Sequence, residues 1–241
     1  MTTRPDKKNS RRKISAFKVH QWLDEWNSVR FNPREHRRKP QSYFYLFKLS
    51  AAELKALTGI RRRQVEERSP QSKDLGIQRR HEKSRSDDIR TYIHHGYPWS
   101  DLSKTKQKSG RYTDLRNPGW LPTAIILNIR KPGYSSKCKK LAKTDAFLIN
   151  EGKGDLATIE LPEGFMDSTW QPNGLHPLEV IDGQHRLWAF EENSQNGQMS
   201  LIPSEDLMDG NFELPVVAFY NLDISWEAYL FWTINISPKR I

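Results

Sequence analysis

The stretch LEVIDGQHRLWAF, residues 178–190, places several chemically different side chains directly after a short apolar run. The run LEVI has the composition of a buried strand. The chain from Gln184 to Glu192 predicts a helix, so the motif DGQHR, residues 182–186, falls at a strand-to-helix junction. The fold class therefore depends on which elements flank this junction.

Strands are predicted on both sides of the junction. After it, ELPVVAFYNLD (residues 213–223) predicts a strand and ISWEAYLFWTIN (residues 224–235) a helix with an aromatic face. Before it, LPTAIILNI (residues 121–129) is a continuous apolar run, as expected for a strand covered on both faces. DAFLIN and DLATIELP predict a hairpin around EGKG (residues 151–154). This order predicts an α+β domain with a small mixed sheet and flanking helices, with α/β as the alternative.

The region before these strands is predicted to hold one further strand and a helix. An aromatic run at residues 43–47 favours the strand. Ser50 followed by Glu53 matches a capping box, which predicts the start of a helix that ends at Gly59.

A second helix is predicted to follow Ser84 or Ser86 as its N-cap. Two aspartates would then lie in its first turn, where carboxylates complement the helix dipole. Gly96 is predicted to end the helix. Residues 102–117 are polar and without periodicity, which predicts a loop.

Residues 1–40 are predicted to form a basic, partly disordered arm. Phe17, Trp22 and Trp26 recur at a spacing compatible with one helix face, so the ordered part of the arm is expected to be a short helix. A domain boundary is expected at its end, with residues 41–241 forming one domain.

The charge of the chain is unevenly distributed. The formal net charge is +10, but residues 1–160 hold 36 Lys and Arg against 17 Asp and Glu (+19), while residues 161–241 hold 3 against 12 (−9). A concentrated positive field attracts polyanions such as DNA, RNA or nucleotides. The alternative is a solubilising surface with an acidic partner face.

The composition also argues against several classes of protein. The single cysteine, Cys138, allows no internal disulfide and no cysteine-based zinc site, which fits a reducing compartment. No apolar run approaches the roughly 20 residues that cross a bilayer. These features favour a cytoplasmic protein without membrane contact.

The residue types at 182–186 suit a phosphate site. The first turn of a helix has unpaired backbone N–H groups and a partial positive charge. Gly183 lacks a Cβ, so a phosphate can approach the backbone closely. Arg186 offers a fork of donors that matches phosphate oxygens, and His185 can exchange a proton near neutral pH. Asp182 would repel a phosphate unless it caps the helix or holds a cation such as Mg²⁺.

Each of these motifs has a structural alternative. Asp182 can be a simple cap, followed by a helix whose His185 and Arg186 point to solvent. The upstream stretch QRRHEKSR, residues 78–85, carries several cations just ahead of a helix. It is a candidate for phosphate contacts, with a solvated charged face as the alternative.

The order of strand, DGQHR, helix and strand resembles the DGQHR-domain family, a branch of the ParB/sulfiredoxin superfamily. In ParB-like domains an arginine-bearing segment precedes a helix, a strand, the phosphate-binding helix and a further strand. Here GIQRRH precedes IRTYIHHG, then come LPTAIILNI, LEVIDGQHRLWAF and ELPVVAFYNLD. The resemblance covers about residues 75–235 and implies the ParB/sulfiredoxin-like mixed sheet.

The resemblance also implies a site for nucleotide phosphates, which holds CTP in ParB-type clamps and ATP in sulfiredoxin. Carried over by position, Gly183, Gln184, His185 and Arg186 would bind ATP. Asp182 would support the turn or hold Mg²⁺.

A second phosphate contact is implied upstream, at Arg79 and Arg80, which correspond to the arginine-bearing segment. The catalytic cysteine of sulfiredoxin is replaced by Gln184, which argues against peroxiredoxin repair. For hydrolysis, Arg186 would stabilise charge, while the residues alone do not decide between Asp182 and His185 as the base.

Known members of the family accompany DNA modification in bacteria. DndB-type members are DNA-binding regulators linked to phosphorothioation, and DpdB-type members partner a transglycosylase-like enzyme that places 7-deazaguanine in DNA and are associated with ATP hydrolysis. The segments GIQRRHEKSRSDDIRTYIHHGYPWS and AYLFWTINISPKRI look closer to the DpdB type. The expectation is a DNA-associated, ATP-hydrolysing protein of such a system, with a C-terminal helical part missing. The alternatives are a non-catalytic transcriptional regulator and a ParB-like nuclease.

Overall fold

The computed structural model describes residues 11–32, 34, 38–58, 83–136, 138–165, 167, 169–190 and 212–235. The chain divides into two compact units, which are described separately. One comprises Met1–Phe47, Ile126–Ile181 and Val216–Ile241, and the other comprises Lys48–Ile125 and Asp182–Pro215. The domain boundary expected at residue 40 stays a prediction.

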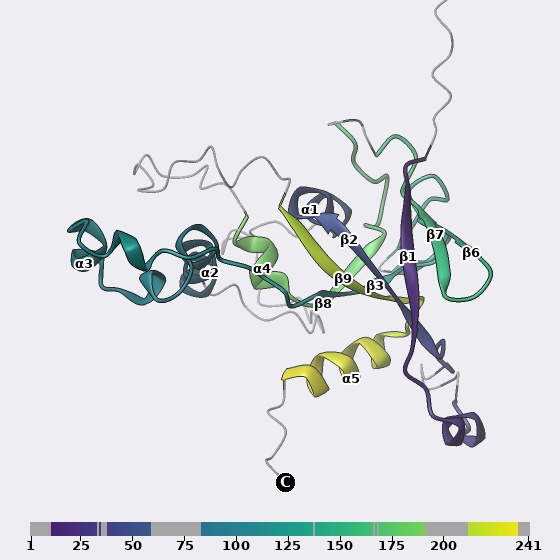
Figure 1. The fold of residues 1–241 in the computed structure, drawn as a ribbon. Coiled ribbons are helices and arrows are strands. Elements are labelled where there is room, and N and C mark those ends of the chain that lie inside the picture. The colour runs from purple at the N-terminus through teal and green to yellow at the C-terminus, as the bar shows by residue number, and fades with distance from the viewer. Residues whose placement is uncertain are drawn as a thin grey trace, which may run out of the picture. The chain divides into compact units, whose positions relative to one another are not determined.

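The strands form a seven-stranded sheet in the order β6-β7-β1-β2-β9-β3-β8, and Figure 1 labels each of them. Their bounds are β1 Lys13–His20, β2 Tyr43–Ser50, β3 Ile125–Ile129, β6 Leu148–Glu151, β7 Leu156–Glu160, β8 Leu178–Asp182 and β9 Glu213–Tyr220. A separate two-stranded sheet pairs β4 (Ser135–Ser136) with β5 (Lys139–Lys140). With the helices below, the protein is α+β, as predicted.

The prediction of an N-terminal helix is wrong, because residues 13–20 form strand β1. This strand lies between β2 and β7 and is antiparallel to both, with Phe17 opposite Leu46 and Ala16 opposite Ala157. Ala16 is fully buried, whereas Phe17 is 56% exposed, so neighbouring side chains alternate between the faces. Figure 1 shows β1 crossing the sheet between these two partners.

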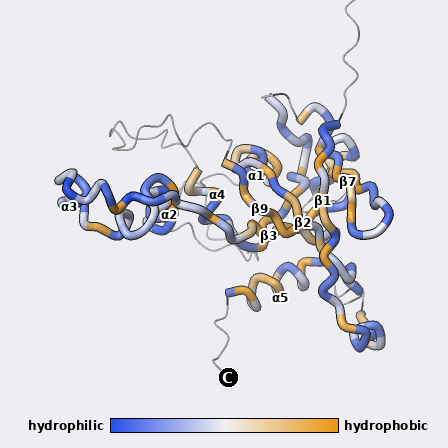
Figure 2. The backbone as a smooth tube through the Cα atoms, in the orientation of Figure 1, coloured by the Kyte–Doolittle hydropathy of each residue, from blue (hydrophilic) through white to orange (hydrophobic). Residues whose placement is uncertain are grey.

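Several other predicted strands are confirmed. The hairpin around EGKG consists of β6 and β7, whose antiparallel register pairs Ile149 with Ile159. The strands predicted at LEVI and ELPVVAF are β8 and β9. The strand predicted at residues 121–129 is shorter, since β3 begins at Ile125. Ile125, Leu127 and Ile129 of β3 are fully buried, as expected for an inner strand. Strands β3 and β9 are correspondingly apolar in Figure 2.

Asn128 is a buried polar residue of the first unit whose amide is hydrogen-bonded within the core. The amide of Asn128, on β3, is buried and donates hydrogen bonds to the Leu222 carbonyl at 3.0 Å and to Glu227 Oε1 at 2.6 Å. It also accepts a hydrogen bond from the Leu222 backbone N–H. Glu227 lies on α5 (Ile224–Asn235), the helix predicted for residues 224–235. Asn128 therefore joins β3 to the start of this helix.

Arg11 was predicted to lie in the basic N-terminal arm, but its side chain is hydrogen-bonded within the fold. Its side chain is only 9% exposed. Its guanidinium donates hydrogen bonds to four backbone carbonyls and to the carboxylate of Glu163. The carbonyls are those of Ala146 (2.6 Å), Leu161 (3.1 Å), Lys143 (2.9 Å) and Thr144 (3.1 Å). This cation holds the loop before β6 rather than facing solvent.

The second unit begins with the predicted capping box. The Ser50 backbone N–H donates to Glu53 Oε2 at 2.9 Å, and the Glu53 N–H donates to Ser50 Oγ at 3.3 Å. These bonds start helix α1 (Ala51–Thr58), which buries Leu54 and Leu57 completely. The predicted stop at Gly59 lies outside the described residues.

Helix α2 (Lys83–His95) begins earlier than predicted, so Ser84 and Ser86 lie inside it and its first turn carries no acidic residue. Its end at His95 confirms the stop at Gly96, which adopts φ +60. Residues 102–117 are not wholly irregular, because they contain helix α3 (Lys104–Lys108) and a 3₁₀ turn at Thr113–Leu115. Among the described residues, no helix is long and apolar enough to cross a membrane.

Candidate functional site

The DGQHR motif forms a tight turn between β8 and a short helix. Asp182 ends the strand, Gly183 adopts φ 101 and ψ 7, and α4 covers Gln184–Trp188. A Cβ at Gly183 would lie 2.7 Å from Ile125 Cδ1 and 3.0 Å from Arg186 Nη2. Glycine is therefore required both by its backbone angles and by the close approach of these side chains.

Arg186 is held back against the start of the turn. Its Nη2 donates a hydrogen bond to Asp182 Oδ2 at 2.9 Å, and its Nη1 donates to the Thr123 carbonyl at 2.8 Å. The side chains of Arg186 and Asp182 are 14% and 28% exposed. The structural alternative for these residues is wrong, since Arg186 does not point to solvent and the N-cap of α4 is Gly183, with no side-chain capping hydrogen bond from Asp182.

A second guanidinium lies close enough to affect Arg186. Burial lowers the pKa of Arg186, the charge of Asp182 raises it, and the positive charge of Arg85 lowers it further. Arg85 lies on α2 and is exposed. Two cations and one carboxylate leave an excess of positive charge here, which an anion would reduce. The sequence pointed to Arg85 only as the last residue of QRRHEKSR.

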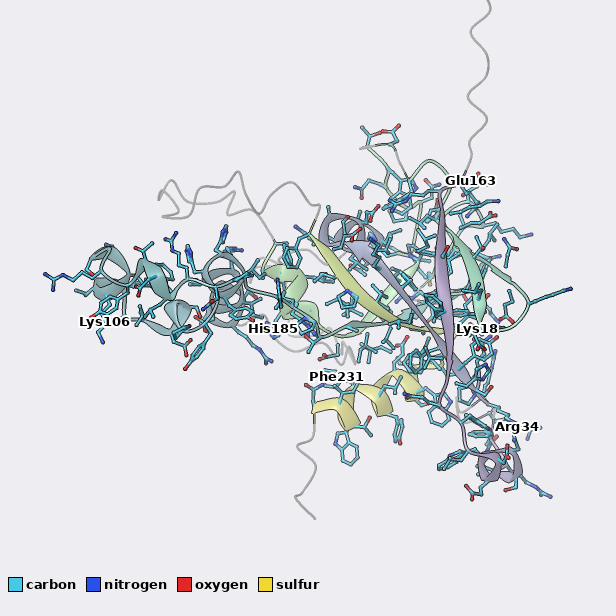
Figure 3. All side chains as sticks on the ribbon, viewed as in Figure 1. Lys18, Arg34, Lys106, Glu163, His185 and Phe231 are labelled. Atoms are coloured by element: carbon cyan, nitrogen blue, oxygen red, sulfur yellow. The ribbon has the colours of Figure 1, made fainter. Side chains whose placement is uncertain are left out.

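Gln184 and His185 are largely buried, at 7% and 8% exposure. The His185 ring packs edge-on against Trp188, with centroids 5.0 Å apart and planes at 78°. Figure 3 labels His185 on α4. These two side chains therefore offer little surface to a ligand, and only part of the predicted site is open.

The other end of α4 is held by cations. Arg90 Nε donates to the Ala189 carbonyl at 2.8 Å, and Lys55 Nζ donates to the Phe190 carbonyl at 3.1 Å. Positive side chains here satisfy the last carbonyls and complement the helix dipole. Because α4 has only five residues, its own dipole is weak, so Arg85 and Arg186 supply most of the attraction for an anion.

The structure brings together Asp182, Gly183 and Arg186, whereas Arg79 and Arg80 lie outside the described residues. Within the described ranges, no group of three or more His, Cys, Asp or Glu side chains is arranged to hold a metal ion. A Mg²⁺ ion here would have Asp182 as its protein ligand and would need phosphate oxygens and water for the rest, a coordination that Mg²⁺ commonly adopts.

No protein-family model, curated protein or solved structure significantly matches this chain.

Proposed function

We propose that the turn at residues 182–186, together with Arg85, binds the phosphates of a nucleotide, with ATP and Mg²⁺ as the ligands. The observation that carries this proposal is the Arg186–Asp182 ion pair beside a glycine turn, with the charge of Arg85 near enough to lower the pKa of Arg186. Arg186 has five N–H donors, and two hydrogen bonds to protein oxygens leave donors for phosphate. Gly183 leaves room for the Arg186 guanidinium, which would lie 3.0 Å from a Cβ at this position.

The roles of the individual residues follow from their positions. Arg186, fixed by Asp182 and the Thr123 carbonyl, would stabilise negative charge on the phosphates without reorganising. Asp182 would offer its Oδ1 to Mg²⁺, since its Oδ2 accepts the hydrogen bond of Arg186, and the ion would neutralise phosphate charge when bound. His185 is buried, so we assign it to positioning α4. Arg79 and Arg80 stay in the proposal as further phosphate contacts from the same basic stretch.

We further propose that the chain has the ParB/sulfiredoxin-like fold and acts as a cytoplasmic, DNA-associated component of a bacterial DNA-modification system, such as 7-deazaguanine insertion or phosphorothioation. The charge excess of +19 over residues 1–160 supports contact with DNA. The protein partner would be the modifying enzyme, of transglycosylase-like type in the first case. ATP hydrolysis would reposition DNA for that enzyme.

The second candidate is a DndB-like transcriptional regulator without catalysis. The burial of Gln184 and His185 and the internal bonds of Arg186 favour it, since they describe a motif that stabilises a turn. This candidate predicts binding to one DNA sequence and no ATP turnover.

ATP binding and phosphate release, measured with Mg²⁺ and with or without duplex DNA, separate the two candidates. Arg85→Ala is the cleaner variant, because Arg85 is exposed and its loss leaves the turn intact. We expect it to weaken ATP binding about tenfold, in line with the 1.5–3 kcal/mol of a charge-assisted hydrogen bond, and Arg186→Ala to abolish it. Arg30→Ala, which removes an exposed arginine of the other compact unit, is the matched control. Wild-type binding to ATP in both folded variants would contradict the proposed site.

A further inference from the structure

Residues 97–120 form a basic loop that is closed at its neck by two glycines. A Cβ on Gly96 would lie 2.2 Å from the Asn117 carbonyl oxygen, and a Cβ on Gly119 would lie 2.0 Å from the Tyr92 carbonyl oxygen. The two ends of the loop therefore approach each other and α2 at backbone contact. The Asn117 N–H donates to the His95 carbonyl at 3.0 Å, which fixes the returning chain to the end of α2.

The inside of this basic loop is packed around one aromatic ring. Trp99 is only 7% exposed and packs against His95, with ring centroids 3.9 Å apart and planes tilted by 51°, and its ring centroid lies 5.0 Å from the guanidinium carbon of Arg116. The Gln107 side chain donates to the Trp99 carbonyl at 3.4 Å. The loop therefore has a small core of its own, so the residues on its outside are held in place.

The outside of the basic loop combines positive charge with exposed aromatic rings. Its exposed cations are Lys104, Lys106, Lys108, Arg111 and Arg116. With two aspartates, the loop has a net charge of +3. None of these five cations forms a salt bridge with a carboxylate of the described residues, while Lys106 and Arg116 lie over the rings of Tyr112 and Trp99. Figure 2 shows α3 as hydrophilic, and Figure 3 shows Lys106 extending from it. Such unpaired cations suit a polyanion.

Two exposed aromatic residues flank the neck. Tyr97 is 64% exposed and Trp120 is 75% exposed. Their backbones are anchored, because Asn117 Nδ2 donates to the Tyr97 carbonyl at 2.7 Å and the Tyr92 hydroxyl donates to the Trp120 carbonyl at 3.1 Å. Large rings held out in solvent on a fixed backbone offer stacking surfaces for bases. Bases present their faces in this way only when the strand is unpaired.

We infer that the basic loop binds single-stranded nucleic acid, with its cations contacting the phosphates and with Trp120 and Tyr97 stacking on bases. This inference rests on the proposed association with DNA, because that DNA would be the source of the single strand. It is independent of the ATP site, since none of these residues belongs to the turn at 182–186.

The test is binding of a fluorescently labelled thymidine homopolymer, which has no secondary structure, compared with a duplex of the same length. We expect the full chain to bind the homopolymer more tightly than the duplex. Trp120→Ala should weaken homopolymer binding about tenfold, given the 1–3 kcal/mol that one stacked base contributes. Lys106→Ala with Lys108→Ala should weaken it and reduce its salt dependence.

The matched control removes two exposed lysines elsewhere, as Lys139→Ala with Lys140→Ala, and should change binding less. Tighter binding to the duplex would overturn the inference, as would unchanged homopolymer binding by folded Trp120→Ala. ATP binding by the same preparations keeps the two proposals apart. If Trp120→Ala loses homopolymer binding but keeps ATP binding, the inference about the basic loop is supported. If the parent chain binds ATP but no homopolymer, that inference is overturned, while the proposed ATP site is unaffected.

Discussion

Arg186 and Asp182 form an ion pair across the DGQHR turn, with Arg186 Nη2 2.9 Å from Asp182 Oδ2. The two residues are four positions apart, but a strand end and a left-handed glycine lie between them, so this is not a pair along one helix. The pair exists because Gly183 turns the chain sharply and leaves room for the guanidinium. The geometry of the Arg186–Asp182 pair therefore depends on Gly183 as well as on the two charged residues.

Arg186→Lys is expected to lower the free energy of unfolding by about 1–2 kcal/mol. A lysine ammonium cannot reach Asp182 and the Thr123 carbonyl with the fixed fork of a guanidinium. Urea unfolding measures the change. A double-mutant cycle with Asp182→Asn should show coupling between the two residues, whereas additive effects would mean that the ion pair contributes nothing to stability.

Gly119→Ala is expected to lower the free energy of unfolding by about 3 kcal/mol. The new Cβ would lie 2.0 Å from the Tyr92 carbonyl oxygen of α2, and no side-chain rotation can relieve this overlap with the backbone. Gly110 is the control. It adopts φ +69 with no atom within 4 Å of its Cβ position, so Gly110→Ala should cost only about 1 kcal/mol. Thermal unfolding compares the two variants, and equal losses would contradict the closed neck.

Most of the α+β architecture could be predicted from local sequence patterns. The capping box at Ser50 and Glu53 and the hairpin around EGKG are encoded by neighbouring residues, and both formed as predicted. Strand β1 was missed because its partners, β2 and β7, are distant in sequence. Lys13–His20 carries both polar and apolar residues on each face, so no clear alternation marks it, and its strand state depends on pairing at both edges rather than on local propensity.

The candidate site was predicted less completely than the fold. The motif predicted a turn at residues 182–186, which the structure has. Gly183 takes the left-handed position because glycine, without a Cβ, adopts that conformation without strain. The Thr123 carbonyl and Arg85 were not identified as neighbours of Arg186, because their proximity arises from packing of segments far apart in the chain. The burial of His185 against Trp188 likewise depends on which face of α4 packs inward.

Arg11→Lys is expected to destabilise the protein by about 2 kcal/mol, because a lysine cannot serve four backbone carbonyls and Glu163 at once. Lys13→Ala is the control, since Lys13 is 66% exposed and its ion pair with Glu160 is worth well under about 1 kcal/mol. Chemical denaturation of both variants provides the comparison. If Arg11→Lys were as stable as the parent protein, the buried guanidinium would not hold the loop.

His95 is expected to make the neck of the basic loop sensitive to acid. Burial lowers the pKa of His95 to about 4, with smaller contributions from the positive charges of Arg116 and His94. The unfolded chain therefore takes up this proton near pH 6.5, whereas the folded protein takes it up only near pH 4. The stability that neutral His95 contributes is therefore complete above about pH 6.5 and is lost as the pH falls from about 6.5 to about 4.

His95→Phe should remove this part of the acid sensitivity. The phenyl ring can keep the contact with Trp99, and His95 Nδ1 has no hydrogen-bond partner within the described ranges, so no bond is lost there. His20→Phe is the control, because His20 is 54% exposed on β1. Melting temperatures between pH 7 and pH 4 should fall less steeply for His95→Phe than for the parent or the control. Parallel curves for all three proteins would show that the neck does not titrate through His95.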